Sequence, residues 1–216
     1  CMLALKRALA RLPAWLALLF SPLVFSAPDP GFERLEDFLA RLDTLTANFT
    51  QDVVNRDDEL VESASGQVAL KKPGRFRWDY REPFERVIVA DGERVWLYEA
   101  DLDQVTVRLL DEGLGETPAA LLTGAVGVLD RFEYRGSETL DELLWIELGP
   151  RSDASDFDSV RLGFAGSELA RLELRDRLGQ TTRLAFSAIE QGVELPAAVF
   201  TFDVPDGVDV IGEDEL

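Results

Sequence analysis

The sequence predicts a mainly β protein: one strongly curved antiparallel sheet that forms an incomplete, half-open barrel of about eleven strands, covered by helices. Short runs rich in β-branched and aromatic residues recur over residues 64–204, and clusters of Gly, Pro and Asp separate them. An amphipathic stretch precedes these runs. No repeat and no linker divides the chain, so we expect one folded domain.

The first 27 residues have the features of a cleavable secretory signal peptide. Their apolar run is shorter than the roughly 20 residues that a membrane-spanning helix needs. We expect cleavage after Ser26 or Ala27, which leaves 28–216 as the folded domain. The signal has a basic start, an apolar run and a small-residue exit: Lys6, Arg7 and Arg11, then 14–25, then Ser26 and Ala27.

Charge and cysteine content narrow the possible functions. The net charge is −19 and the pI is about 4.3, which argues against nucleic-acid binding because that binding depends on Lys and Arg. Met2 is the natural start, so we expect Cys1 to be foreign to the chain and the mature protein to have no cysteine. It would then fold in an oxidising compartment without disulfides.

A long helix is predicted directly after the signal peptide. Asp29 and Pro30 form a helix start, with a capping side chain followed by proline at the first helical position. Apolar residues then recur at spacings of three and four as far as Val53, which predicts an amphipathic helix of about six turns. We expect the polar segment 55–63 to be an exposed loop or a continuation of the turn into the first strand. The apolar positions are Phe32, Leu35, Phe38, Leu39, Leu42, Leu45, Phe49 and Val53.

The strands are predicted from alternation and from turn signals. Phe76 and Trp78 alternate with Arg75 and Arg77, so one face of that strand is aromatic and the other charged. Residues 95–98 (VWLY) are apolar on both faces, so we expect both sides of the sheet to be covered there. The predicted strands are 64–71, 75–80, 85–91, 94–100, 104–109, 131–135, 143–148, 157–164, 168–175, 181–189 and 198–204.

A second, short helix is predicted between the two groups of strands. Thr117 is a capping residue and Pro118 occupies the first helical position, with apolar residues following until Gly124. This segment is either a connector that packs on the core or a lid, because glycine-flanked apolar segments are typical of hinged covers.

The residues that most enzymes need are missing. The chain has no histidine, so a Ser-His-Asp or Cys-His arrangement cannot form. No phosphate-binding loop and no calcium-loop spacing is present, and we expect no catalytic residue, metal or cofactor. The one enzyme class left open is a glycosidase, which needs only two carboxylates across a cleft.

Several segments together resemble the outer-membrane lipoprotein carrier family of the Lol pathway. They appear in the family's order along the whole predicted domain: NFTQ at 48–51, Gly66, KKPGRFRWDYREP at 71–83, IVADGERVWLYEADLDQVTV at 88–107, ETPAALLTG at 116–124 and FTFDVPDGVDVI at 200–211.

The resemblance implies a periplasmic, non-enzymatic chaperone with an apolar cavity for acyl chains. Its partners would be acylated lipoproteins, an inner-membrane ABC transporter that releases them and an outer-membrane receptor that accepts them. We expect the carrier itself to be a monomer. The receptor of similar fold is itself a lipoprotein and would need a cysteine after the leader, where this chain has none.

The resemblance also assigns site residues. Those of the acyl-chain cavity would be Phe76, Trp78, Val89, Trp96 and Tyr98, and Lys72 occupies the position of an arginine that latches the lid in the family. Lysine keeps the charge but lacks the planar fork of arginine, so we expect a looser latch. The lid would include Pro118, Ala119, Leu121, Leu122 and Gly124.

Three other interpretations remain open. A periplasmic domain of related fold that senses lipid or protein would share the sheet and the leader. The two-carboxylate glycosidase would need a water-lined acid pair. The third is a β-rich protein whose aromatic residues form only an ordinary core.

Overall fold

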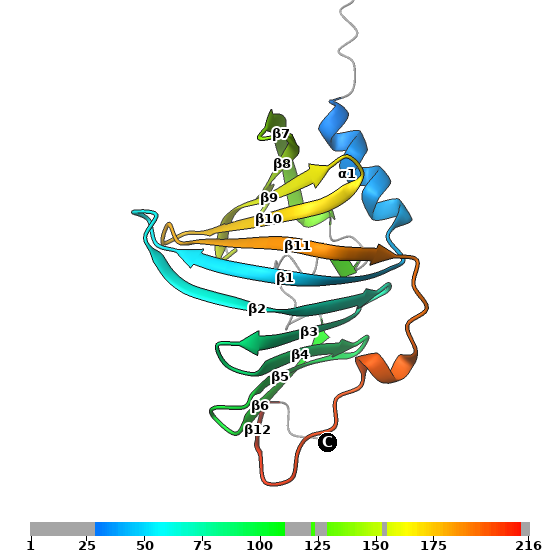
Figure 1. The fold of residues 1–216 in the computed structure, drawn as a ribbon, viewed down its shortest axis with the longest axis vertical. Coiled ribbons are helices and arrows are strands. Elements are labelled where there is room, and N and C mark those ends of the chain that lie inside the picture. Colours follow the sequence, from blue (N-terminus) through cyan, green and yellow to red (C-terminus); the bar gives the residue numbers. More distant parts are fainter. Residues whose placement is uncertain (1–28, 111–121, 124–128, 153–154, 213–216) are drawn as a thin grey trace, which may run out of the picture.

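The computed structural model describes residues 29–110, 122–123, 129–152 and 155–212, and confirms a single curved sheet (Figure 1). No helix in this part of the chain is long and apolar enough to cross a membrane. The sheet has twelve strands in the order β12-β6-β5-β4-β3-β2-β1-β11-β10-β9-β8-β7. The strands are β1 Thr44–Val54, β2 Leu60–Lys71, β3 Arg75–Glu82, β4 Arg86–Asp91, β5 Arg94–Glu99, β6 Gln104–Leu109, β7 Phe132–Leu140, β8 Leu143–Pro150, β9 Phe157–Ala165, β10 Glu168–Asp176, β11 Thr181–Gln191 and β12 Asp209–Gly212.

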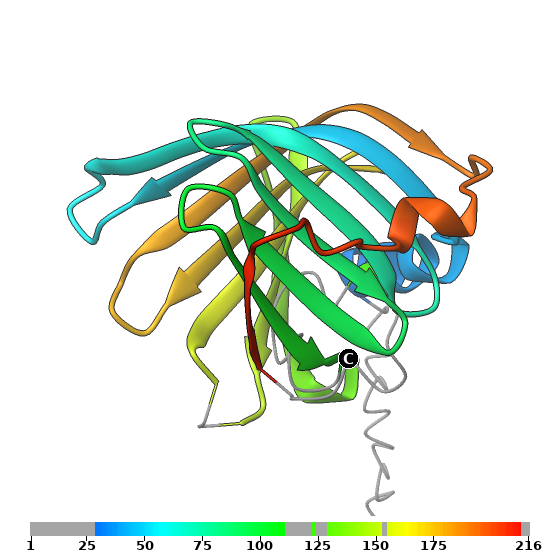
Figure 2. The same ribbon diagram turned by 90° about the horizontal axis from the view of Figure 1, so that it is seen from below.

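The sheet is a half-barrel because its two edges do not meet. Neighbouring strands pair antiparallel, except that β12 pairs parallel with β6. β1 lies in the middle, between β2 and β11, and so joins the two halves of the chain. β7 and β12 are the edges, and Figure 2 shows the sheet as an arch with a convex and a concave side.

The N-terminal helix is shorter than the sequence predicted. Helix α1 spans Pro30–Arg41, and the side chain of Asp29 caps it by accepting a hydrogen bond of 2.9 Å from the amide of Gly31. The prediction of six turns was wrong, because residues 44–54 form β1. Leu45, Phe49 and Val53 are four residues apart, which places them on one side of a helix but equally on one face of a strand.

Two other boundaries differ from the sequence prediction. β2 begins at Leu60, so the segment 55–63 is not a loop throughout but leads from the turn into this strand, the second of the two predicted alternatives. The strand predicted at 198–204 is wrong, because residues Ala197–Phe200 form a 3₁₀ helix, η2, and the final strand comes later, as β12. Phe202 and Val204 instead pack against Trp96, Val105 and Val107 as a cover of the sheet, and Phe200 is buried. The other ten predicted strands are confirmed.

The main hydrophobic core lies between the concave face and α1. It takes buried residues from α1, from β1 to β5 and from β7 to β11. α1 lies on the concave side of the arch (Figure 2) and its buried residues enter this core. The buried residues of α1 are Gly31, Leu35, Phe38 and Leu39.

Candidate functional site

The concave face of β1, β2 and β3 is lined by large apolar side chains. Residues directly opposite each other in an antiparallel sheet share a face. Trp78 lies opposite Val68, which in turn lies opposite Ala47, and all three are buried in the main core. Phe76 belongs to the same face, next to Leu70.

Aromatic rings form a connected group at the centre of this face. The ring of Phe49 lies 5.3 Å from that of Trp78 and 5.0 Å from that of Tyr80, centroid to centroid. Trp78 also contacts Phe186 of β11, at 6.3 Å. Gly66 makes room for Phe49, because a Cβ atom at Gly66 would lie 2.9 Å from the Phe49 ring. These rings bridge the two halves of the sheet.

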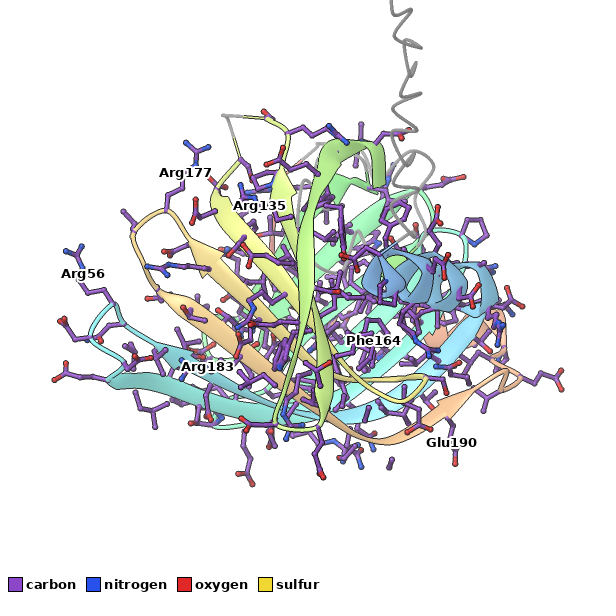
Figure 3. All side chains as sticks on the ribbon, turned by 90° about the horizontal axis from the view of Figure 1, so that it is seen from above. Arg56, Arg135, Phe164, Arg177, Arg183 and Glu190 are labelled. Atoms are coloured by element: carbon purple, nitrogen blue, oxygen red, sulfur yellow. The ribbon has the colours of Figure 1, made fainter. Side chains whose placement is uncertain are left out.

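Helix α1 closes this face from the concave side. Phe38 is packed edge-on against Phe164 of β9, with centroids 5.1 Å apart. Figure 3 shows Phe164 inside, close to α1, whereas Arg56 and Arg177 project from hairpins away from the helix. The apolar side of α1 therefore occupies space that the concave face would otherwise expose.

A small apolar cavity lies on this face next to Leu42 and Leu122, and a larger polar groove of about 210 Å³ lies between α1 and the strands β10 and β11. The volume of the apolar cavity is about 10 Å³. That is about the space of one water molecule, so the apolar side chains around this cavity are closely packed. The residues that line the apolar cavity are Leu42, Leu45, Ala47, Val68, Leu70, Leu122, Leu169, Phe186 and Ile189.

The turn between β2 and β3 holds the C-terminal end of α1. The ammonium group of Lys72 donates a hydrogen bond of 2.5 Å to the carbonyl oxygen of Leu39, in the last turn of the helix. The amide of Gly74 in the same turn donates to the carbonyl of Thr123 at 3.2 Å. Burial lowers the pKa of Lys72, and the carboxylate of Asp43 opposes that shift.

A polar contact also holds the N-terminal end of α1. The hydroxyl of Ser137 on β7 donates a hydrogen bond of 2.8 Å to the Asp29 carboxylate, and Phe32 is packed edge-on against Tyr134 at 5.4 Å. The pKa of Asp29 is lowered by the Tyr134 hydroxyl, then by Ser137 and the Gly31 amide. The Tyr134 hydroxyl makes no hydrogen bond to a described residue by distance and angle, so we attribute its effect on the Asp29 pKa to the nearness of the hydroxyl dipole to the carboxylate.

The five predicted cavity residues lie on two different faces. Phe76 and Trp78 line the concave core. Trp96 and Tyr98 belong to a second, smaller cluster, in which Phe202 lies 6.1 Å from Trp96 and 5.8 Å from Tyr98. Val89 lies directly opposite Trp96 and so shares its face.

The alternation of a strand explains this separation. Trp96 and Tyr98 lie opposite Val89 and Val87, whereas the concave residue Trp78 lies opposite Ile88. The convex positions are covered by the C-terminal segment, which is also held by a hydrogen bond of 2.7 Å from Lys71 to the carbonyl of Leu195. The two adjacent lysines, Lys71 and Lys72, thus fasten covers on opposite sides of the sheet.

The convex face of the other half of the sheet is charged. A row of directly opposed residues alternates in sign from β8 to β11: Glu147, Arg161, Glu173 and Arg183. Arg161 pairs with Glu173 at 3.2 Å and its guanidinium lies 4.7 Å from the centre of the Trp145 ring. The sheet therefore separates a polar outer surface from an apolar inner one.

Comparisons with known proteins match this arrangement. The family described as outer membrane lipoprotein carrier protein LolA matches residues 40–203. The chain belongs to this family. It is 39% identical over 194 residues to the outer-membrane lipoprotein carrier protein of Dechloromonas aromatica, covering 90% of this chain and 93% of that one. It is 42% identical to that of Methylibium petroleiphilum, covering 85% and 90%.

Solved structures give the same fold. A LolA superfamily protein from Nitrosomonas europaea superposes with a TM-score of 0.50 at 15% identity, over 80% of this chain and 97% of that one. An uncharacterized conserved protein from Thermus thermophilus superposes with a TM-score of 0.51 at 16% identity, over 84% and 96%.

The expected LolA lid is described only in part. Pro118, Ala119, Leu121 and Gly124 lie outside the described residues. Leu122 is buried and lines the small cavity. Lys72, expected to latch this lid, binds the carbonyl of Leu39 in α1.

Sequence reasoning missed Phe49 and Phe186 as site residues. Phe49 was assigned to the long helix, so its place beside Trp78 was hidden. Phe186 lies on β11, which is far from β1 in the sequence but pairs with it directly, as in the pair Phe49 and Phe186. Apolar residues at 45, 47, 49 and 53 were the signal for a strand in this segment.

Proposed function

We propose that this LolA family member is a periplasmic carrier that shelters the acyl chains of lipoproteins against its concave face. It takes them from an inner-membrane ABC transporter and delivers them to an outer-membrane receptor. The observation that carries the proposal is the continuous apolar concave surface, with Phe76 and Trp78 in it, which is covered by a separate helix rather than by a second sheet.

Acyl chains enter by displacing the cover. The apolar cavity next to Leu42 and Leu122, of about 10 Å³, holds no hydrocarbon chain, so binding against this face requires α1 to move outward. Burying one methylene group contributes roughly 0.8 kcal/mol, so an acyl chain offsets the loss of the contacts made by α1. Without cargo the helix covers an apolar patch that would otherwise promote aggregation.

Lys72 acts as the latch of the empty carrier in this proposal. Its hydrogen bond to Leu39 fixes the end of α1, and the same turn reaches Thr123 through Gly74. One turn thus holds both α1 and the segment next to the expected lid. When the latch opens, the Lys72 ammonium regains contact with water, which recovers part of the free energy that its burial costs.

The direct test uses inner-membrane spheroplasts that contain labelled lipoproteins. Added carrier should release lipoproteins into the soluble fraction as a complex, and outer-membrane vesicles should then accept them. The matched variants are Ile88→Glu, which adds a charge to the half-buried concave face, and Gln67→Glu, which adds the same charge to the exposed convex face. Release should be lost only with Ile88→Glu. A folded wild-type carrier that releases no lipoprotein would refute the proposal.

A further inference from the structure

We propose that the concave face contains a polar subsite for the carbonyl or carboxylate oxygen at the head of an acyl chain, formed by Gln51, Trp78, Tyr80 and Arg86. The proposal rests on the carrier function above and adds an orientation for the ligand. Its ligand chemistry is an oxygen acceptor attached to a hydrocarbon chain, either an acyl ester of a lipoprotein or a free fatty acid.

The four residues lie together on one side of the sheet. Tyr80 lies directly opposite Arg86, and Trp78 is two residues from Tyr80 on the same face. The Tyr80 hydroxyl donates a hydrogen bond of 3.1 Å to the side-chain oxygen of the buried Gln51. The guanidinium carbon of Arg86 lies 4.2 Å above the centre of the Tyr80 ring. A cation is therefore placed on an otherwise apolar surface.

Two hydrogen-bond donors of this cluster lack an acceptor. The indole Nε1 of Trp78, whose side chain is 7% exposed, and the buried Nε of Arg86 have no hydrogen-bond partner among the described residues. Among the residues that the structure describes, no carboxylate lies within ion-pair distance of Arg86. Buried donors are normally paired, because an unpaired one loses its water without compensation. An acceptor oxygen of a ligand would supply the missing partner.

The protonation of Tyr80 leaves the cluster cationic. Burial raises the pKa of Tyr80; the positive charge of Arg86 opposes the shift, and the nearby carboxylate of Glu62 adds to it. The hydroxyl therefore stays neutral and remains bound to Gln51, while the Arg86 charge stays available. Such a cluster favours an oxygen with negative or partial negative charge over an apolar group.

The concave face is polar at one end and apolar at the other. The Tyr80 and Arg86 pair lies near the turn between β3 and β4, while Phe76 and Leu70, near the turn between β2 and β3, lie beside the apolar cavity. Four residues of strand separate Tyr80 from Phe76, roughly 14 Å. A bound acyl chain would place its oxygen near Arg86 and its hydrocarbon toward the cavity, since the opposite direction leaves both donors unpaired.

The test compares three ligands of equal chain length: laurate, methyl laurate and dodecyl methyl ether. Each displaces the neutral dye N-phenyl-1-naphthylamine from the purified protein, and dissociation constants are obtained for wild type, Trp78→Phe and Arg86→Met. The matched controls on the convex face are Trp145→Phe, which is buried beside Arg161, and Arg81→Met, which removes an equal charge from an exposed side chain. Thermal unfolding checks that every variant is folded.

We expect wild type to bind laurate and methyl laurate more tightly than the ether. Arg86→Met should weaken laurate roughly tenfold and Trp78→Phe should weaken both carbonyl ligands roughly fivefold, with little change for the ether or in the control variants. Equal weakening of all three ligands, or a wild type that does not distinguish ester from ether, would overturn the subsite and leave the carrier proposal standing. A wild type that binds neither dye nor any ligand would overturn both.

Discussion

The carboxylate of Asp29 accepts a hydrogen bond of 2.8 Å from the hydroxyl of Ser137, which joins the start of α1 to the edge strand β7. At its other end the helix is held by Lys72. α1 is thus a strap fixed at two points and apolar along one side. A hydrogen bond contributes on the order of 1 kcal/mol to stability, so neither point prevents the strap from opening when a ligand replaces its apolar contacts.

Replacing Lys72 by Ala should loosen the strap. We expect stronger fluorescence of an apolar dye with the ligand-free protein, because the end of α1 then opens more often. Lys71→Ala is the matched control, since Lys71 binds Leu195 on the other side of the sheet. Equal dye binding by the Lys72 variant and wild type would remove Lys72 from the latch.

Replacing Lys72 by Arg should have the opposite effect. The guanidinium group can bind two acceptors at once, so Leu39 and a second carbonyl of the α1 end become available together. We expect lower dye binding and slower hydrogen exchange of the α1 amides, measured by mass spectrometry. Faster exchange in this variant than in wild type would contradict the role of the side chain as a donor to the helix.

Acid should release the N-terminal end of α1. The pKa of Asp29 is lowered by Tyr134, Ser137 and Gly31, so the ionised carboxylate stabilises the folded state at pH values above roughly 3.9, the usual value of the free side chain. This stabilisation is lost as the pH falls below that value, toward the lowered pKa. Urea unfolding at several pH values should show that wild type has a higher free energy of unfolding than Asp29→Asn and that this difference shrinks in acid. A difference that stays constant with pH would contradict the contribution of the ionised Asp29 carboxylate.

Replacing Phe202 by Ala should affect stability but not acyl binding. The ring covers Trp96 and Tyr98 on the convex face, and its removal should cost about 2 kcal/mol of unfolding free energy because the side chain is only half-buried. Trp96 should become more exposed, with a red shift of its emission when residues 28–216 are produced without Trp78 and Trp145, so that Trp96 is the one tryptophan present. Loss of ligand binding in the folded variant would show that the ligand binds on the convex face and not on the concave one.

Replacing Gly66 by Ala should disrupt the centre of the site. The new Cβ atom would lie 1.9 Å from the carbonyl oxygen of Asp79 and 2.9 Å from the Phe49 ring, so strand β3 and this ring must both shift. We expect a loss of more than about 2 kcal/mol of stability together with altered dye binding. Ser65→Ala, one residue away, is the control; a Gly66 variant as stable as that control would show that β3 accommodates the methyl group.

The sequence predicted the sheet well because hairpin strands can be identified from local signals, namely alternation and turn residues. Phe76 and Trp78 alternate with charged residues, and turn residues mark both ends of their strand. β1 was missed because Leu45, Phe49 and Val53 fit both periodicities, and the weaker alternation that includes Ala47 was not used; its pairing with β2 and with β11, distant in sequence, makes this segment a strand. The face occupied by Trp96 was not predictable either, since a strand that is apolar on both sides gives no signal for which side is concave.

The central position of β1 has a consequence for how the chain folds. The hairpins from β1 to β6 need only near neighbours, but β1 gains its second partner only when β11 arrives, and the partners of α1, β7 and β8, also come late in the sequence. Until then the aromatic surface around Phe49 is uncovered. Such distant pairing is slow to form and favours aggregation of intermediates, so the surface that would shelter a cargo is itself exposed until the second half of the chain has been made.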